Sequence, residues 1–135
     1  MKMRFFVVVL MVAVVGFAAC GPKPPAPEKS NNTDIAKFMV GSIEYTDIKA
    51  SGEILYTYPK TGTNAWASLP TGKNEPATIT LEDSKAKTDP SSVTLDFTKV
   101  GEAGTAGTVG SFDVISESGK KKTYTVKVTK NPNQQ

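Results

Sequence analysis

The sequence predicts an all-β protein, a single sandwich of antiparallel strands. Three observations predict this fold class. Short alternations of apolar and polar residues, such as Gly52 to Tyr58, recur along the chain beyond residue 35. Turn-forming Gly, Pro, Asn and Ser separate them about every ten residues. No apolar stripe at helical spacing follows the first 19 residues, so we expect two packed sheets.

Residues 1–19 are expected to be an export signal. Lys2 and Arg4 give it a positive beginning, and an uncharged apolar run of 13 residues follows from Phe5 to Phe17. This run is shorter than the roughly 20 residues that a helix needs to cross a bilayer, so it is typical of a cleaved signal. It ends close to Cys20, the one cysteine of the chain.

Ala18-Ala19-Cys20 resembles the lipobox of bacterial lipoproteins. In that family the thiol accepts a diacylglyceryl group, a peptidase cuts just before the cysteine, and the new amine is usually acylated. The resemblance implies lipid attachment at Cys20 and a membrane as partner. Gly21 is not the Asp that resembles an inner-membrane retention signal, which favours the outer membrane of a cell envelope. An ordinary secretory signal with a chance cysteine is the alternative.

A lipidated cysteine and a Pro-rich linker are expected over residues 20–34. Four prolines lie between residues 22 and 27, and polar residues follow, so nothing here builds a core. In a polyproline conformation, at about 3.1 Å per residue, the linker would hold the domain up to about 40 Å from the lipid. The sandwich domain is expected over residues 35–130, with a tail at 131–135.

Strands within the domain follow from alternating apolar and polar faces. The expected strands are Gly52 to Tyr58, a weaker Ala65 to Leu69, Ala77 to Leu81, Val93 to Phe97, and a closing hairpin of Phe112 to Ser116 and Thr123 to Thr129. Residues 117–120 form the hairpin turn. The Gly-rich stretch 101–110 is not expected to bind phosphate, because no Lys-Ser or Lys-Thr and no helix start follow it. It is expected to be a mobile loop instead.

Charge and composition exclude several classes of site. Removal of residues 1–19 leaves 116 residues without Arg or His, and with 14 lysines against 13 acidic residues. The near-neutral balance and the missing guanidinium groups argue against nucleic-acid binding. With Cys20 acylated, no thiol or imidazole is left for a soft metal or a nucleophile, and we expect no cofactor.

Four segments carry a second resemblance: Ile35 to Phe38, Gly52 to Thr63, Asp96-Phe97-Thr98, and Phe112 to Val128. Together they resemble a recurrent Ig-like or cadherin-like β-sandwich module of bacterial surface lipoproteins, over about 95 residues. The resemblance implies an Ig-like sandwich, and the family has no shared catalytic residues to carry over.

Trp66, the one tryptophan, is a candidate binding residue. It is flanked by Ala65 and Ala67 and follows a Thr-Gly-Thr-Asn turn. Such a setting leaves an indole free to stack on a sugar or to anchor a protein partner. The alternative is that Trp66 caps one end of the core, which the usual burial of tryptophan favours.

Lys120, Lys121 and Lys122 are a second candidate site, in the expected hairpin turn. As a cationic cluster they would contact anionic lipid headgroups or acidic glycans. The alternative, which we favour, is a solvated turn that shields an edge strand.

Catalytic and metal signals are weak. Glu82, Asp83 and Asp89 lack the ligand spacing of a known calcium loop. The adjacent Glu82 and Asp83 would point to opposite faces of a strand, and Ser84-Lys85 is an ordinary turn composition. We therefore expect no metal site and no enzyme.

The function expected from these observations is that of a lipid-anchored, non-catalytic binding or adhesion module at the cell envelope, with a protein or a glycan as ligand. The alternative is a periplasm-facing structural or accessory subunit of an envelope assembly. The two differ in the side of the outer membrane on which the domain lies.

Overall fold

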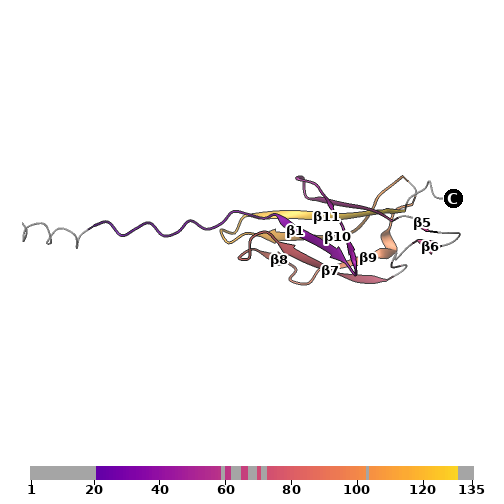
Figure 1. Ribbon diagram of the computed structural model, residues 1–135, viewed down its shortest axis with the longest axis horizontal. Helices are drawn as coiled ribbons and strands as arrows, with labels where there is room; N and C mark the ends of the chain where they lie inside the picture. The colour runs from indigo at the N-terminus through magenta and orange to yellow at the C-terminus, as the bar shows by residue number, and fades with distance from the viewer. Residues whose placement is uncertain are drawn as a thin grey trace, which may run out of the picture.

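The computed structural model describes residues 21–58, 60–61, 65–66, 70, 73–102 and 104–130, with the backbone alone at 60–61 and 65–66. Within them the predicted all-β sandwich is confirmed. Two sheets pack face to face around one apolar core (Figure 1). The helical content of the described residues is one short 3-10 helix, η2 (Phe97–Lys99).

The first sheet has the strand order β2-β1-β7-β9 and is antiparallel throughout. Its strands are β1 (Ile35–Val40), β2 (Ile43–Glu44), β7 (Asn74–Leu81) and β9 (Thr94–Asp96). β1 pairs with β7 from Ile35 opposite Leu81 to Val40 opposite Ala77. β9 pairs only with the first three residues of β7. The second half of β7 therefore has a neighbouring strand on one side only.

The second sheet has the strand order β3-β4-β11-β10-β8. Its strands are β3 (Asp47–Ile48), β4 (Glu53–Tyr58), β8 (Lys87–Asp89), β10 (Gly107–Ile115) and β11 (Lys121–Lys130). β10 and β11 form the predicted closing hairpin, and β4 pairs with β11 in parallel. A parallel pair requires a long connection, which here is most of the domain.

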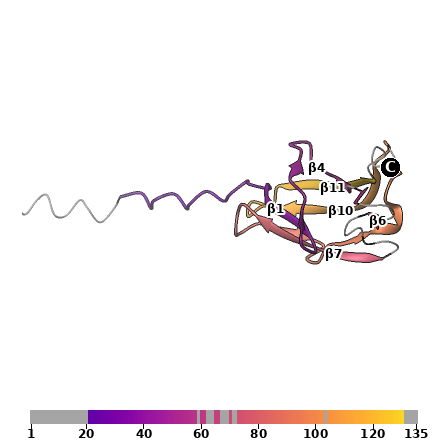
Figure 2. The same ribbon diagram turned by 45° about the vertical axis from the view of Figure 1, so that its right-hand side comes forward.

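A separate two-stranded ribbon follows β4. It consists of β5 (Lys60–Thr61) and β6 (Ala65–Trp66), with Lys60 paired to Trp66. The ribbon lies at the end of the sandwich away from residues 21–29 (Figure 2).

The chain crosses from the first sheet to the second at Tyr45, between β2 and β3. The buried backbone N–H of Tyr45 donates to the Phe38 carbonyl oxygen over 2.9 Å. Its hydroxyl lies 2.9 Å from that of Tyr58 in β4, and both side chains are fully buried. Burial raises the pKa of both phenols, so they stay neutral. The hydrogen bond between their hydroxyls holds the segment around Tyr45 against β4.

Aromatic side chains form a continuous series of ring contacts through the core. The members are every Phe and Tyr beyond residue 17: Phe38, Tyr45, Tyr56, Tyr58, Phe97, Phe112 and Tyr124. Phe112 stacks on Phe38 and on Tyr124, with centroids 5.9 and 5.6 Å apart. Tyr45 stacks on Tyr56 at 4.3 Å. Such pairs add about 0.5–1.5 kcal/mol beyond the area that they bury.

Most predicted strands are confirmed at slightly different bounds. Val93, Leu95 and Phe97 are buried together as expected, although Phe97 begins η2 instead of ending a strand. Of the weaker predicted strand, the structure describes Ala65–Trp66, and residues 67–69 lie outside the described part. The strands β2, β3, β5 and β8 were not predicted, because two or three residues carry no alternation to recognise.

The prediction of a mobile loop over residues 101–110 is wrong for a large part of that stretch. Residues 107–110 belong to β10, and Gly101 forms a parallel bridge to Thr129. A Cβ at Gly101 or at Gly107 would come within 1.8 or 1.9 Å of a backbone oxygen. These glycines allow two backbone segments to come into contact. Their role here is close packing and not conformational freedom.

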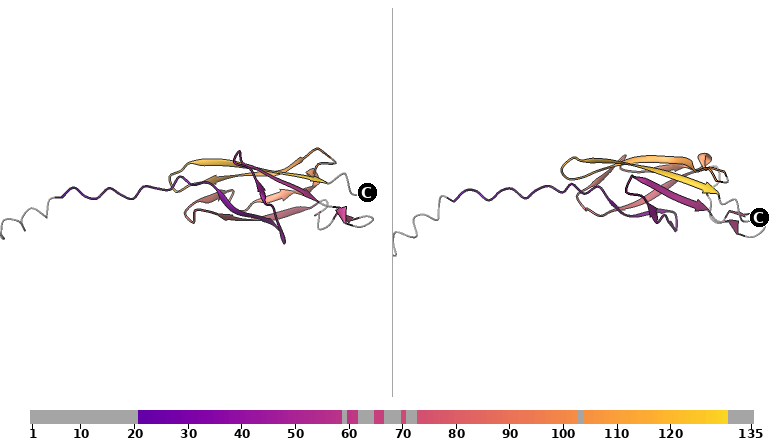
Figure 3. Two further views of the ribbon diagram at one scale, coloured as in Figure 1. Left: turned by 45° about the horizontal axis from the view of Figure 1, so that its top comes forward. Right: turned by 90° about the horizontal axis from the view of Figure 1, so that it is seen from above.

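The sandwich has two distinct ends. At the tether pole, residues 30–34 meet the β7–β8 loop (82–86) and the β10–β11 turn (116–120). At the distal pole lie η2 and the ribbon of β5 and β6, and the strands run lengthwise between the two (Figure 3). Residues 21–29 extend away from the tether pole in every view.

Candidate functional site

The last five residues of the expected linker, 30–34, pack onto the tether pole. The Ser30 carbonyl oxygen accepts a hydrogen bond from the Ser118 N–H over 3.0 Å. Ser30 Oγ accepts from the Asn32 N–H at 3.1 Å, and Asn32 Oδ1 accepts from the Asp34 N–H at 2.7 Å. Short Ser and Asn side chains favour such turns because they bond the backbone two residues further on. The sequence itself therefore bends the linker before β1.

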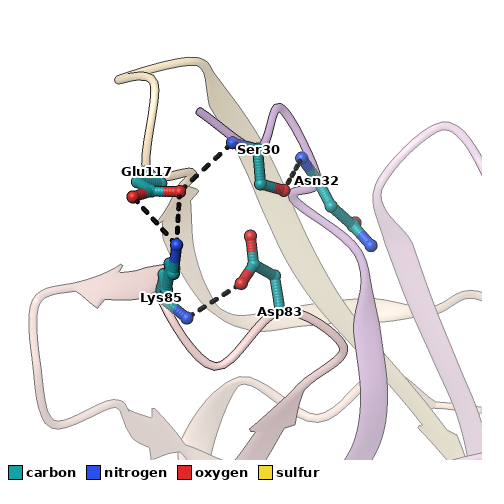
Figure 4. Close-up of polar contacts among 5 residues, drawn as sticks. All are labelled: Ser30, Asn32, Asp83, Lys85 and Glu117. Atoms are coloured by element: carbon teal, nitrogen blue, oxygen red, sulfur yellow. Dashed lines mark hydrogen bonds and ion pairs between the residues drawn. The ribbon is translucent and has the colours of Figure 1, made fainter. Parts of the chain in front are cut away.

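Glu117, in the β10–β11 turn, joins the linker to the β7–β8 loop (Figure 4). Its Oε2 accepts from the Ser30 N–H at 3.3 Å, and both carboxylate oxygens accept from Lys85 Nζ at 3.2 and 3.3 Å. The Ser30 amide and the Lys85 ammonium lower the pKa of Glu117. One carboxylate thus connects three segments that are distant in sequence.

Asp83 lies beside this contact. Its Oδ1 accepts from the Lys85 N–H at 2.9 Å. Its Oδ2 is buried and faces Ser30 (Figure 4). The Ser30 side chain and the Lys85 amide lower the pKa of Asp83. Asp83 and Glu117 therefore stay ionised at neutral pH, which suits ion pairing and not proton donation.

Thr33 and Asp34 complete the docked segment. Thr33 is 6 % exposed, and its carbonyl oxygen accepts from the Tyr124 hydroxyl at 3.2 Å. Lys122 Nζ donates to Asp34 Oδ1 at 2.8 Å and stands 4.9 Å from the centroid of the Tyr124 ring. We call residues 30–34 and their partners the tether base; the partners are Glu82, Asp83, Lys85, Glu117, Ser118, Lys122 and Tyr124.

A shallow groove of about 290 Å³ lies beside the tether base. It is lined by Asp34, Ile35, Ile48, Lys49, Ala50, Lys122 and Tyr124. Both of its lysines contact carboxylates: Lys122 contacts Asp34, and Lys49 contacts Asp47 at 2.6 Å. An anionic ligand in this groove would therefore meet only lysines that are already paired with carboxylates.

The structure places the three candidate lysines differently from the prediction. Lys120 ends the turn and is exposed, whereas Lys121 and Lys122 belong to β11, so their assignment to the turn is wrong. Lys121 Nζ lies 2.8 Å from Asp113 Oδ2, and this contact raises the pKa of Lys121. Since Lys122 pairs with Asp34, two of the three are engaged in ion pairs. This geometry favours the structural interpretation over headgroup binding.

Two other predicted site residues fall wholly or partly outside the described residues. Cys20 lies outside them, and so does the side chain of Trp66. The backbone of Trp66 belongs to β6 at the distal pole, paired with Lys60. Lipid attachment at Cys20 and both interpretations of Trp66 stay predictions.

The acidic residues considered as a calcium site are separated by the fold. Glu82 Oε2 accepts from Asn32 Nδ2 at 3.2 Å at the tether base, whereas Asp89 lies in β8 opposite Asp113. Within the described ranges, no group of three His, Cys, Asp or Glu side chains is arranged to hold a metal ion.

Sequence reasoning missed the tether base because it treated residues 30–34 as linker. The signal that could have found it is a run of five polar, turn-favouring residues directly before an apolar strand. Their partners could not have been named from sequence, since Ser30 and Glu117 lie 87 positions apart.

Comparison with known proteins finds no relative: no family model, curated protein or solved structure matches the chain. In the part of the chain that the structure describes, no helix is long and apolar enough to cross a bilayer. Function is therefore inferred from the residues and geometry of this chain alone.

Proposed function

We propose that the chain is a lipid-anchored lipoprotein of the bacterial cell envelope and that its β-sandwich is a non-catalytic binding or adhesion module. Acyl chains on Cys20 supply the anchor after removal of residues 1–19. Two or more chains give stable attachment, whereas a single chain would bind a membrane only marginally.

The observation that carries this proposal is the tether base. It fixes the point at which the linker joins the domain, at one end of an elongated sandwich. The remaining residues 21–29 reach at most about 28 Å, at about 3.1 Å per residue. An anchor at Cys20 therefore holds the tether pole near the membrane and presents the distal pole, with the ribbon of β5 and β6, to a protein or glycan ligand.

The chemistry of the tether base supports a positioning role. The pKa values of Asp83 and Glu117 are both lowered by groups of Ser30 and Lys85 within the tether base, whereas a general acid at neutral pH needs a raised value. Its side chains bond the linker and one another, so they are occupied in holding the domain to its tether.

The anchor is tested by the intact mass of the chain recovered from expressing bacteria. A chain that begins at Cys20 and carries the added mass of a diacylglyceryl group and an amide-linked acyl group supports the proposal. A chain that begins elsewhere with an unmodified thiol overturns it. A Cys20→Ser variant is the matched control and should carry no lipid.

Orientation is tested by protease treatment of intact cells, followed by detection of the domain, with a periplasmic protein as lysis control. Loss of the domain while the control protein survives supports a surface module. Protection until the envelope is opened contradicts surface binding and supports the alternative, a periplasm-facing subunit of an envelope assembly.

A further inference from the structure

The second half of β7 is an open sheet edge. The Ala77 N–H donates to the Val93 carbonyl oxygen at 2.9 Å, on the side of β9. The Glu82 N–H donates to the Asp34 backbone carbonyl oxygen at 3.1 Å, on the side of β1. In an antiparallel ladder, successive residues direct their backbone groups to opposite sides. Beyond Ala77, the odd-numbered residues therefore direct both N–H and C=O away from β1.

Those residues are Ile79 and Leu81. No strand of the described chain lies beside them on that side, because β9 ends its pairing at Pro76. Their side chains are half-buried at the rim of the core, while Thr78 and Thr80 are exposed on the outer face. The edge therefore offers backbone hydrogen bonds together with apolar surface.

Nothing in Thr78 to Leu81 blocks a second strand. Proteins commonly protect sheet edges with Lys, Pro or a bulge. This stretch contains neither residue type, and the one Pro of β7, Pro76, lies in the part that β9 covers. The bulge in this pair of strands is in β1, between Ile35 and Lys37, and leaves β7 regular.

We propose that this edge binds the same edge of a second copy of the chain, in an antiparallel pair that continues the sheet across the dimer. One register satisfies the backbone: Ile79 opposite Leu81 of the second copy, with Thr80 opposite Thr80 on the two-fold axis. A shift by one residue would bring outward-directed groups against inward-directed ones. Each of the two Ile79–Leu81 pairs exchanges two hydrogen bonds.

Symmetry also selects the antiparallel arrangement. A two-fold axis perpendicular to the sheet keeps the inner faces of both copies on the same side, so that Ile79 and Leu81 of both copies form one apolar surface. An axis along the strands would place these side chains on opposite faces and leave them in water.

The neighbouring edge strand is compatible with this partner. β8 follows β7 after residues 82–86 and is the last strand of the second sheet, with Lys87 and Asp89 exposed at its two ends. Where two such edges meet antiparallel, Lys87 of one copy approaches Asp89 of the other. These opposite charges favour a second copy over an unrelated strand.

The orientation of the dimer follows from the direction of β7. This strand runs towards the tether pole, since Leu81 pairs with Ile35 where the chain enters the sheet. Antiparallel pairing therefore points the two tether poles in opposite directions. If the domain is lipid-anchored and surface-exposed, as proposed above, the two copies are anchored in two facing membranes. This edge, in the half of β7 near the tether pole, then binds a second copy on another cell and leaves the distal pole free for the protein or glycan ligand.

The affinity of a single pair of copies is expected to be low, whereas many pairs between two surfaces bind strongly together. About four backbone hydrogen bonds and a small apolar surface hold each pair, which is less than a stable soluble dimer buries. Many copies on facing surfaces act together, because the first contacts raise the effective concentration of the rest.

Thr80 gives the sharpest test. It is exposed, and across the two-fold axis its side chain would meet its own copy at the short spacing of a non-hydrogen-bonded pair, with Cα atoms about 4.5 Å apart. Thr80→Lys and Thr80→Glu therefore each place like charges together at the centre. Thr57→Lys, on an exposed position of β4 in the other sheet, is the matched control.

Self-association is measured by analytical ultracentrifugation of the whole chain in detergent, over a concentration series. We expect a reversible dimer whose Kd rises roughly tenfold or more in Thr80→Lys and in Thr80→Glu, through like-charge repulsion. An equimolar mixture of the two variants should associate again, and Thr57→Lys should match the unmodified chain.

Two results overturn the edge pairing: a chain that stays monomeric at every concentration, or a dimer that neither Thr80 variant weakens. Thermal unfolding verifies that each variant is folded, and recovery in the mixture excludes misfolding as the cause of lost association. None of these readouts depends on lipidation or surface display, so they separate this inference from the proposed function.

Facing membranes are tested with lipid vesicles that carry the acylated chain. Unmodified vesicles should cluster, vesicles with either Thr80 variant alone should not, and the two variant populations mixed together should cluster again. Dimers in detergent without clustering of vesicles would overturn the opposed orientation.

Discussion

Single residues decide how the chain passes between its two sheets. The Tyr45 and Tyr58 hydroxyls lie 2.9 Å apart in a fully buried site, and the tyrosine rings continue into the stacked aromatic series of the core. The crossover is thus fixed by this hydrogen bond, together with the bond from the Tyr45 N–H to the Phe38 carbonyl oxygen. Both lie in a largely apolar interior, where an unmatched polar group is costly.

Replacement of one tyrosine of this pair by phenylalanine should destabilise the protein more than the removal of a single oxygen atom suggests. Tyr45→Phe or Tyr58→Phe leaves the other hydroxyl buried without its partner, which should lower the free energy of unfolding by about 1–3 kcal/mol. The double variant should lose less than the sum of the two. Urea unfolding of the four proteins measures this, and strict additivity would show that the two hydroxyls are not coupled.

Gly107 should tolerate no side chain. In Gly107→Ala the Cβ would lie 1.9 Å from the Lys99 carbonyl oxygen and 2.5 Å from the Gly101 nitrogen, so backbone must move. We expect a loss of about 2 kcal/mol or more. Gly104→Ala is the control: its φ of +81° is unfavourable for Ala, at about 1 kcal/mol, but its Cβ meets open space. Equal losses in the two variants would contradict close packing at Gly107.

Among the elements, the docked segment 30–34 depends on contacts that its own sequence cannot supply. Glu117 and Ser118 come from the β10–β11 turn, and Lys85 from the β7–β8 loop. The segment is therefore a part of the domain that forms only when both loops are in place.

Loss of Glu117 should expose the linker to protease. Glu117→Ala removes the acceptor of the Ser30 N–H, so trypsin should cleave after Lys29 faster than in the unmodified chain, while the sandwich resists. The overall free energy of unfolding should change little, because exposed ion pairs contribute little to stability. Glu44→Ala, which loses an exposed ion pair with Lys37, is the control. Unchanged cleavage after Lys29 would show that the segment is held without Glu117.

The elements also show how far sequence reasoning reaches. Long alternations such as Thr123 to Thr129 predicted strands correctly because the side chains that they bury follow a period of two. Residues 107–110 were assigned to a loop because glycine has no side chain to reveal a face, although these glycines lie in β10. The open edge of β7 depends on where β9 stops, which is a property of the sheet and not of either segment.

At the scale of the whole molecule, stability should be flat over a wide pH range. The chain has no His. The pKa values of Asp83, Asp113 and Glu117 are lowered by folding, so their contribution is present above their ordinary values of about 4 and is lost as the pH falls through the lowered values. The pKa values of Lys121 and Lys122 are raised, so their contribution is lost only as the pH rises through values above about 10.4.

Thermal unfolding from pH 2 to pH 11 should therefore show a plateau between about pH 5 and pH 9, with a fall on each side. The acid limb should be shallower in Glu117→Gln, which has no carboxylate to protonate at that position. A step in the melting temperature between pH 6 and pH 7.5 would contradict this account.

The path of β1 also determines how the molecule carries a load. β1 begins where the linker docks and runs towards the distal pole, with β7 beside it along its length. A pull on the tether, with the far end held, draws β1 along its own axis. The hydrogen bonds from the Ile35–Leu81 pair to the Val40–Ala77 pair are then sheared together and cannot be opened one after another. The sandwich is therefore joined to its linker in the geometry that best resists a pull along the linker.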